Sequence, residues 1–110
     1  MAKISQGSNV VTLINVFTVA PEDQQRLLDL LVEATESAMN KLPGFVSANL
    51  HKSLDGTRVV NYAQWQSREA LEAMLDNPEA LLHIKEAEKI ARKIEPRLYE
   101  VSFVDEAPRS

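Results

Sequence analysis

The segment from Asp55 to Ser67, Asp-Gly-Thr-Arg-Val-Val-Asn-Tyr-Ala-Gln-Trp-Gln-Ser, constrains the fold more than any other part of the chain. It begins with Asp55-Gly56, a pair typical of tight hairpin turns because both residues tolerate a positive φ. The β-branched and aromatic residues that follow predict a strand. Because side chains alternate between the faces of a strand, Asn61 and Trp65 share one face, with the small Ala63 between them. Asn61 and Trp65 are then about 13 Å apart, a spacing that fits the floor of a pocket.

The rest of the chain supplies three more strands and a set of helices. Strands are predicted at Val10–Val19, Phe45–Lys52 and Leu98–Val104. Helices are predicted from Pro21 to the Pro43-Gly44 stop signal, from Ser67 to the break at Asn77-Pro78, and from Pro78 to about Lys93, with Pro96 ending the last one. The order β-α-β-β-α-β, with the second helix broken, predicts a ferredoxin-like α+β fold: an antiparallel sheet with helices on one face.

The sheet face away from these helices is predicted to be apolar. It carries Val10, Ile14, Val16, Val46, Leu50 and Val60. A face of this kind needs a cover, and the simplest cover is a second copy of the same sheet, so we expect a homodimer. A chain of 110 residues buries a limited fraction of its surface alone, which also favours a dimer.

Composition excludes several classes of function. The chain has no cysteine, so disulfides and thiolate metal sites are impossible. Its net charge of −4 comes from mixed charges without a basic stripe, so nucleic acid is not an expected partner. The apolar runs are too short to span a membrane, no signal peptide is recognisable, and the cytoplasm is the expected compartment. Residues 1–8 are expected to form a flexible leader, 9–105 a single domain and 106–110 a polar tail.

Each residue that could carry chemistry also has a structural explanation. Asn15 interrupts the first strand, where an asparagine usually makes structural hydrogen bonds, and Trp65 ends a strand, where a tryptophan usually belongs to the core. His51 and His83 have neither metal-ligand spacing nor an acid next to them in the sequence, so no metal site is predicted. The three glycines are scattered, so there is no phosphate loop and no flavin or nicotinamide fingerprint.

The segment from Asp55 to Ser67 resembles the antibiotic biosynthesis monooxygenase family, and most closely its cofactor-free anthrone monooxygenases of aromatic polyketide pathways. Leu42-Pro43-Gly44-Phe45 and Asn15-Val16-Phe17 support the resemblance, which extends from Val10 to Val104. It implies a dimeric α/β barrel that oxidises a phenolic or quinol-like aromatic to a quinone with O₂, without a cofactor. In those enzymes the asparagine and tryptophan of this strand are implicated in oxygenation, which implies catalytic roles for Asn61 and Trp65.

The implied chemistry starts with loss of a proton from the substrate. The resulting anion passes an electron to O₂, and recombination gives a peroxide that loses water. The protein must orient the substrate and stabilise an oxyanion in a dry site. Asn61 and Trp65 can donate hydrogen bonds to that oxygen, and Asn15 is a possible third donor. The general base stays open: His51 or His83 could serve only if it faces the pocket.

The resemblance is incomplete at the substrate end of the site. The polyketide enzymes have a tyrosine six residues after the tryptophan, where this chain has Leu71. Their helical arginine falls near Ile84 or Lys85. The identity of the aromatic substrate is therefore left open.

The family also contains haem-degrading enzymes, and these define an alternative function. Their first-strand asparagine corresponds to Asn15 and their axial histidine to His83, while their pocket tryptophan corresponds to Met74. A non-catalytic dimeric protein that binds a small molecule is a further alternative. The predicted substrate-binding residues are Asn15, Leu71, Met74 and His83.

Overall fold

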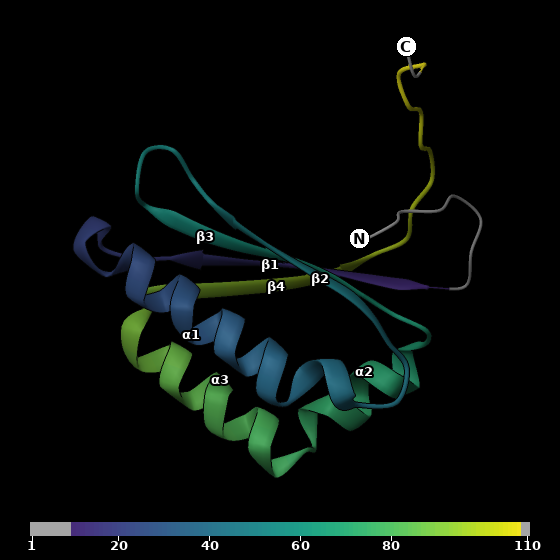
Figure 1. The fold of residues 1–110 in the computed structure, drawn as a ribbon, viewed down its shortest axis with the longest axis horizontal. Coiled ribbons are helices and arrows are strands. Elements are labelled where there is room, and N and C mark those ends of the chain that lie inside the picture. Colours follow the sequence, from purple (N-terminus) through teal and green to yellow (C-terminus); the bar gives the residue numbers. More distant parts are fainter. Residues whose placement is uncertain (1–9, 109–110) are drawn as a thin grey trace.

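The computed structural model describes residues 10–108 and shows one antiparallel four-stranded sheet with helices on one face (Figure 1). The strands are β1 (Val11–Thr18), β2 (Phe45–Lys52), β3 (Arg58–Trp65) and β4 (Lys93–Tyr99), in the spatial order β2-β3-β1-β4. The helices are α1 (Gln24–Ser37), α2 (Arg68–Leu75) and α3 (Pro78–Ile90), with short 3₁₀ turns η1 (Pro21–Asp23) and η2 (Met39–Lys41). The predicted ferredoxin-like α+β fold is confirmed. The predicted leader, residues 1–8, lies outside the described residues.

A polar N-cap residue begins each of the two helices of the second helical region, α2 and α3. The Ser67 Oγ accepts a hydrogen bond from the backbone N–H of Ala70 at 3.1 Å, and begins α2. The Asn77 Oδ1 accepts one from Ala80 N–H at 3.0 Å, with Pro78 at the first position of α3. Both caps satisfy N–H groups that have no partner within the helix. The predicted break at Asn77-Pro78 is therefore confirmed.

The position of β4 differs from the prediction. The last helix ends at Ile90 rather than near Lys93, and the strand covers Lys93–Tyr99 rather than Leu98–Val104. Pro96 lies inside this strand, opposite Asn15 of β1. β4 is at the edge of the sheet, where the missing N–H of a proline can point away from the neighbouring strand at little cost. The sequence rule that a proline ends an element does not apply at a sheet edge.

A β-bulge in β2 changes which residues beyond Phe45 face the helices. Phe45 is opposite Trp65, but Ser47 is opposite Gln64, so one extra residue lies between them. Beyond the bulge, Ala48 and Leu50 face the helices, and Ser47, Asn49 and His51 face the other side. Leu50 therefore does not belong to the outer face, contrary to the prediction, and that face is less apolar than expected.

Two apolar clusters fill the layer between the sheet and the helices. The first, the Leu27 cluster, consists of the buried side chains of Phe17, Val19, Leu27, Val59 and Ala87. The second, the Trp65 cluster, consists of the buried side chains of Trp65, Leu71, Met74 and Ala80. Partly buried side chains around the Trp65 cluster include Val11, Leu13, Met39, Leu42, Phe45 and Ile84. The clusters lie at opposite ends of β1 and β3, which leaves the middle of these two strands between them.

The outer face of the sheet is of mixed polarity. Ile14, Val16 and Val60 are partly buried there. Thr12 and Gln64 are almost fully buried on the same face, and the Gln64 Nε2 donates a hydrogen bond to the Thr12 Oγ1 at 3.2 Å. In the part of the chain that the structure describes, no helix has the length and apolar character needed to cross a bilayer.

Candidate active site

Asn15 and Asn61 face each other between the two apolar clusters. They are directly opposite in the pairing of β1 with β3, on the face of the sheet that α1 and α3 cover. On β1, Leu13 packs against the Trp65 cluster and Phe17 belongs to the Leu27 cluster, so Asn15 lies between them. Residues directly opposite on antiparallel strands have Cβ atoms about 4.5–5.5 Å apart, so the two amide groups can contact one small ligand.

The side-chain oxygens of this pair are buried without a partner. Within residues 10–108, the Oδ1 atoms of Asn15 and Asn61 are the two buried side-chain polar atoms that lack a hydrogen bond. A buried acceptor without a donor costs about 1–3 kcal/mol. Folded proteins satisfy nearly all such groups, and exceptions often belong to a functional site. The pair therefore presents two unused hydrogen-bond acceptors on the face of the sheet that the helices cover.

Trp65 lies on the same strand face, at the other end of the site. Its side chain is 2% exposed and packs edge-to-face against Phe45, with ring centroids 5.4 Å apart and an interplanar angle of 90°. Leu71 and Met74 from α2 pack in the same cluster. The structure thus brings three of the predicted site residues, Trp65, Leu71 and Met74, into one apolar wall.

Ala63 separates the amide pair from this wall. It is 3% exposed and lies on β3 between Asn61 and Trp65. The helices above the sheet also present small buried side chains: Ala34 from α1, and Ala80 and Ala87 from α3. Ala80 packs in the Trp65 cluster and Ala87 in the Leu27 cluster, so one small side chain of α3 lies on each side of the amide pair.

The two histidines occupy different environments. His51 is exposed and opposite Val60, so it lies on the outer face of the sheet and cannot serve a site under the helices. His83 is partly buried on α3, and its Nε2 lies 3.4 Å from the Oγ of Ser37 on α1. Ser37 was not among the predicted residues. Nothing in the sequence links two positions 46 residues apart.

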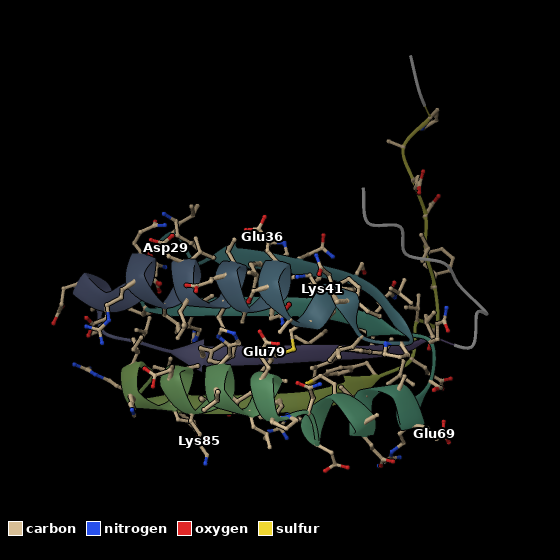
Figure 2. The ribbon with its side chains drawn as sticks, turned by 60° about the horizontal axis from the view of Figure 1, so that its bottom comes forward. Asp29, Glu36, Lys41, Glu69, Glu79 and Lys85 are labelled. Atoms are coloured by element: carbon tan, nitrogen blue, oxygen red, sulfur yellow. The ribbon has the colours of Figure 1, made fainter. Side chains whose placement is uncertain are left out.

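A surface hollow of about 520 Å³ adjoins the Trp65 cluster. It is lined by Leu42, Pro43, Gly44, Gln66, Glu69, Ala70, Ala73, Met74 and Asn77. Met74 and Leu42 contribute both to this hollow and to the packing around Trp65, so the hollow ends at the apolar wall of the site. A second hollow, of about 340 Å³, is lined by residues of α1 alone, such as Asp29 and Glu36, which Figure 2 shows on the outside of that helix.

The site does not favour haem. The Nε2 of His83 is in contact with Ser37, which leaves only its Nδ1 for an iron ion. The position that corresponds to the pocket tryptophan of haem-degrading relatives is occupied by Met74, which is 7% exposed within the Trp65 cluster. Among residues 10–108, no three His, Asp or Glu side chains are placed to hold a metal ion.

Comparisons with known proteins agree with this fold. The family profile described as antibiotic biosynthesis monooxygenase matches residues 10–86. Tetracenomycin-F1 monooxygenase from Streptomyces glaucescens is 47% identical over 92 residues, which cover 84% of this chain and 82% of the relative.

Two solved structures are also similar. The monooxygenase from the gene ActVA-Orf6 of Streptomyces coelicolor, in complex with nanaomycin D, has a TM-score of 0.80 and 25% identity, covering 92% of this chain and 94% of its own. SnoaB from Streptomyces nogalater, a cofactor-independent oxygenase, has a TM-score of 0.76 and 25% identity, covering 88% of this chain and 97% of its own. From these matches and the fold, the chain belongs to the antibiotic biosynthesis monooxygenase family and is an oxygenase of that type.

Proposed function

We propose that the protein is a cofactor-independent monooxygenase that uses O₂ to oxidise a phenolic or quinol-like aromatic of polyketide type to a quinone. The observation that carries the proposal is the buried, unpartnered amide pair of Asn15 and Asn61 between two apolar clusters. Apolar walls with a few converging polar groups are the usual form of a small-molecule site. The relatives named for tetracenomycin F1 and solved with nanaomycin D support an aromatic ligand.

The reaction needs no group that the chain lacks. The substrate loses a proton, and its anion gives one electron to O₂ to form a radical pair. Recombination forms the C–O bond of a peroxide, which takes up a proton and eliminates water to leave the quinone carbonyl. The tasks left for the protein are to hold the ring, to stabilise the oxyanion and to exclude bulk water.

In this proposal the amide pair binds the oxyanion. Each carboxamide carries two N–H donors and one acceptor oxygen, so Asn61 can donate to the anionic oxygen while Asn15 contacts a neighbouring hydroxyl. Donors in a dry, preorganised site stabilise developing charge more strongly than they do in water. The cover of α1 and α3 over this face of the sheet supplies that environment.

Trp65 acts at the other end of the substrate. It lies four positions after Asn61, about 13 Å away at the rise of a strand. A fused-ring aromatic lying over Ala63 therefore spans the two, with its polar edge at the amides and its apolar end against Trp65, Leu71 and Met74. At this separation, the indole N–H of Trp65 reaches the substrate oxygen bound by Asn61 only if both side chains lean toward Ala63. We therefore assign Trp65 two roles: it holds the apolar end of the substrate, and it donates a hydrogen bond.

Oxygen uptake tests the proposal directly. The probe is dithranol, a dihydroxylated anthrone, in buffer with a chelator and no added flavin or metal, and with the uncatalysed rate subtracted. Wild-type protein should consume O₂ and yield the quinone. Asn61→Ala and Trp65→Phe should each lower turnover, by on the order of 10²-fold for a lost preorganised donor.

The matched control is Tyr62→Phe, which removes a polar group next to Asn61 on the opposite face of β3. It should keep wild-type turnover. Thermal unfolding of all three variants separates chemistry from folding. Unchanged activity in Asn61→Ala and Trp65→Phe, or losses that only follow unfolding, would remove these residues from the mechanism. No O₂ uptake by wild type with any phenolic probe would leave the non-catalytic alternative.

A further inference from the structure

A belt of polar side chains, at the level between the two apolar clusters, runs from the sheet to the flank of α1, where Ser37 lines the surface hollow on that helix. The sheet contributes Asn15 and Asn61 to it. On α3, Ala80 belongs to the Trp65 cluster and Ala87 to the Leu27 cluster, so His83 lies between the clusters as the amides do. On α1, Leu31 packs on the Leu27 cluster, and Met39, just past the end of the helix, packs on the Trp65 cluster, which places Ser37 in the same interval.

The hydrogen bonds of Ser37 determine which nitrogen of His83 carries a proton. The Ser37 hydroxyl has one hydrogen, and it donates this to the backbone carbonyl of Glu33 at 2.7 Å. Toward the His83 Nε2, 3.4 Å away, the Ser37 Oγ can therefore only accept. The neutral imidazole then has its hydrogen on Nε2 and a lone pair on Nδ1, the nitrogen that can take up a proton.

Resting on the proposed function, we propose that His83 is the proton acceptor of the reaction and that Ser37 is a positioning residue that holds its tautomer. The Nδ1 of His83 takes the substrate proton as the anion forms, giving an imidazolium whose Nε2–H still bonds to Ser37. After O₂ addition, the imidazolium returns that proton to the peroxide oxygen. The second substrate hydrogen leaves with hydroxide as water when the carbonyl forms, so protons and electrons balance.

Along the two helices, the carboxylates within one turn of Ser37 or His83 are Glu33 and Glu36 on α1, and Glu79 and Glu86 on α3. Glu79 is on the side of α3 that faces α1, and Glu36 is on the outside of α1 (Figure 2). All four are exposed, and Glu86 is paired with Lys89 at 3.1 Å. At this level the sheet presents uncharged side chains: the amides of Asn15 and Asn61, with Leu50 and Pro96 beside them. His83 is thus the side chain of the belt that has a basic nitrogen.

Three variants at two positions test the base. His83→Ala should reduce kcat for dithranol by on the order of 10²–10⁴-fold, and added imidazole should restore part of it. His83→Gln keeps an N–H that can donate to Ser37 but offers no basic nitrogen, so it should remain as slow as His83→Ala while unfolding like wild type. The control is His51→Ala, the other histidine, which should keep wild-type turnover.

The pH–rate profile is the decisive measurement. Wild-type kcat should fall on the acid side as the base is protonated, and this limb should vanish in both His83 variants. Ser37→Ala should lower kcat with little change in KM, and Ser37→Thr, which keeps the hydroxyl, should restore it.

The outcomes separate the two proposals. An active wild type whose acid limb persists in His83→Gln overturns the assignment of the base and leaves the proposed function intact. Recovery of turnover in His83→Gln does the same, because it shows a purely structural hydrogen bond. A wild type without O₂ uptake overturns the proposed function itself, and this assignment with it.

Discussion

The carboxamides of Asn15 and Asn61 are paired across two neighbouring strands, and the oxygen of each is buried without a hydrogen-bond donor. Two such groups at one register position are costly to folding, at about 1–3 kcal/mol each. Apolar side chains of similar size would fill the same space without that cost. The pair is therefore a place where stability and function are expected to pull in opposite directions.

Asn15→Leu replaces one amide by an apolar side chain of similar shape. Because it removes an unsatisfied buried acceptor, we expect the free energy of unfolding to stay level or to rise by about 1 kcal/mol. The same change should cost most of the O₂ uptake with dithranol. Chemical denaturation and oxygen-electrode measurements on one preparation check both effects. A large loss of stability would instead indicate that Asn15 is a structural residue.

We predict that two copies of the chain form a homodimer through the outer faces of their sheets. Val16 and Val60 are directly opposite there and partly exposed in the single chain. Light scattering should give roughly twice the 12.3 kDa chain mass at micromolar concentration. Val60→Lys should shift the protein toward monomer, because a buried unpaired charge opposes association. Val32→Lys, on the exposed side of α1, is the matched control and should remain dimeric.

Gly44 is required where the chain turns from η2 into β2. Its φ is +84°, and a Cβ there would overlap the Cβ of Ala70 on α2. Gly44→Ala should therefore lower the free energy of unfolding by about 1–2 kcal/mol because of the left-handed backbone. The overlap with Ala70 should lower it further. Gly56→Ala shares the positive φ of +81°, but its nearest neighbour, Pro21, is at an ordinary 3.5 Å. Thermal unfolding should rank Gly44→Ala below Gly56→Ala, and equal melting temperatures would contradict the contact with Ala70.

The Asp55 carboxylate stabilises the β2–β3 hairpin in a pH-dependent way. Its Oδ1 accepts hydrogen bonds from the Thr57 hydroxyl at 2.7 Å, the Thr57 N–H at 3.0 Å and the Ser53 hydroxyl at 2.8 Å. These hydrogen bonds lower the pKa of Asp55 from 3.8 to about 2, and the bond from the Thr57 side chain contributes most.

Because the folded pKa of Asp55 is the lower one, the unfolded chain binds more protons between these values, and this stabilisation is lost as pH falls from 3.8 to about 2. NMR titration of the Asp55 carboxyl carbon should locate its midpoint at the lower end of that range. In Asp55→Asn, the free energy of unfolding should fall less steeply as pH is lowered from 3.8 to about 2, because the contribution of Asp55 is absent. A carboxyl that titrates at the ordinary value would show that the turn does not hold in solution.

The sequence by itself determined the order and type of the elements. Signals that lie within a few residues were sufficient: side-chain alternation from Val59 to Trp65, the Asp55-Gly56 turn, the helix start at Ser67 and the break at Asn77-Pro78. The bounds predicted for β2, Phe45–Lys52, are those of the structure. The placement of Asn61 and Trp65 on one face also followed, because the period of a strand is a local property.

Only the tertiary structure decided which side chains meet. The pairing of Asn15 with Asn61 depends on β1 lying beside β3, and the contact of Ser37 with His83 depends on α1 packing beside α3. The bulge after Phe45 moved Leu50 under the helices, and the edge position of β4 allowed Pro96 inside a strand. Each of these outcomes depends on neighbours distant in the chain, so no local pattern of residues could specify it.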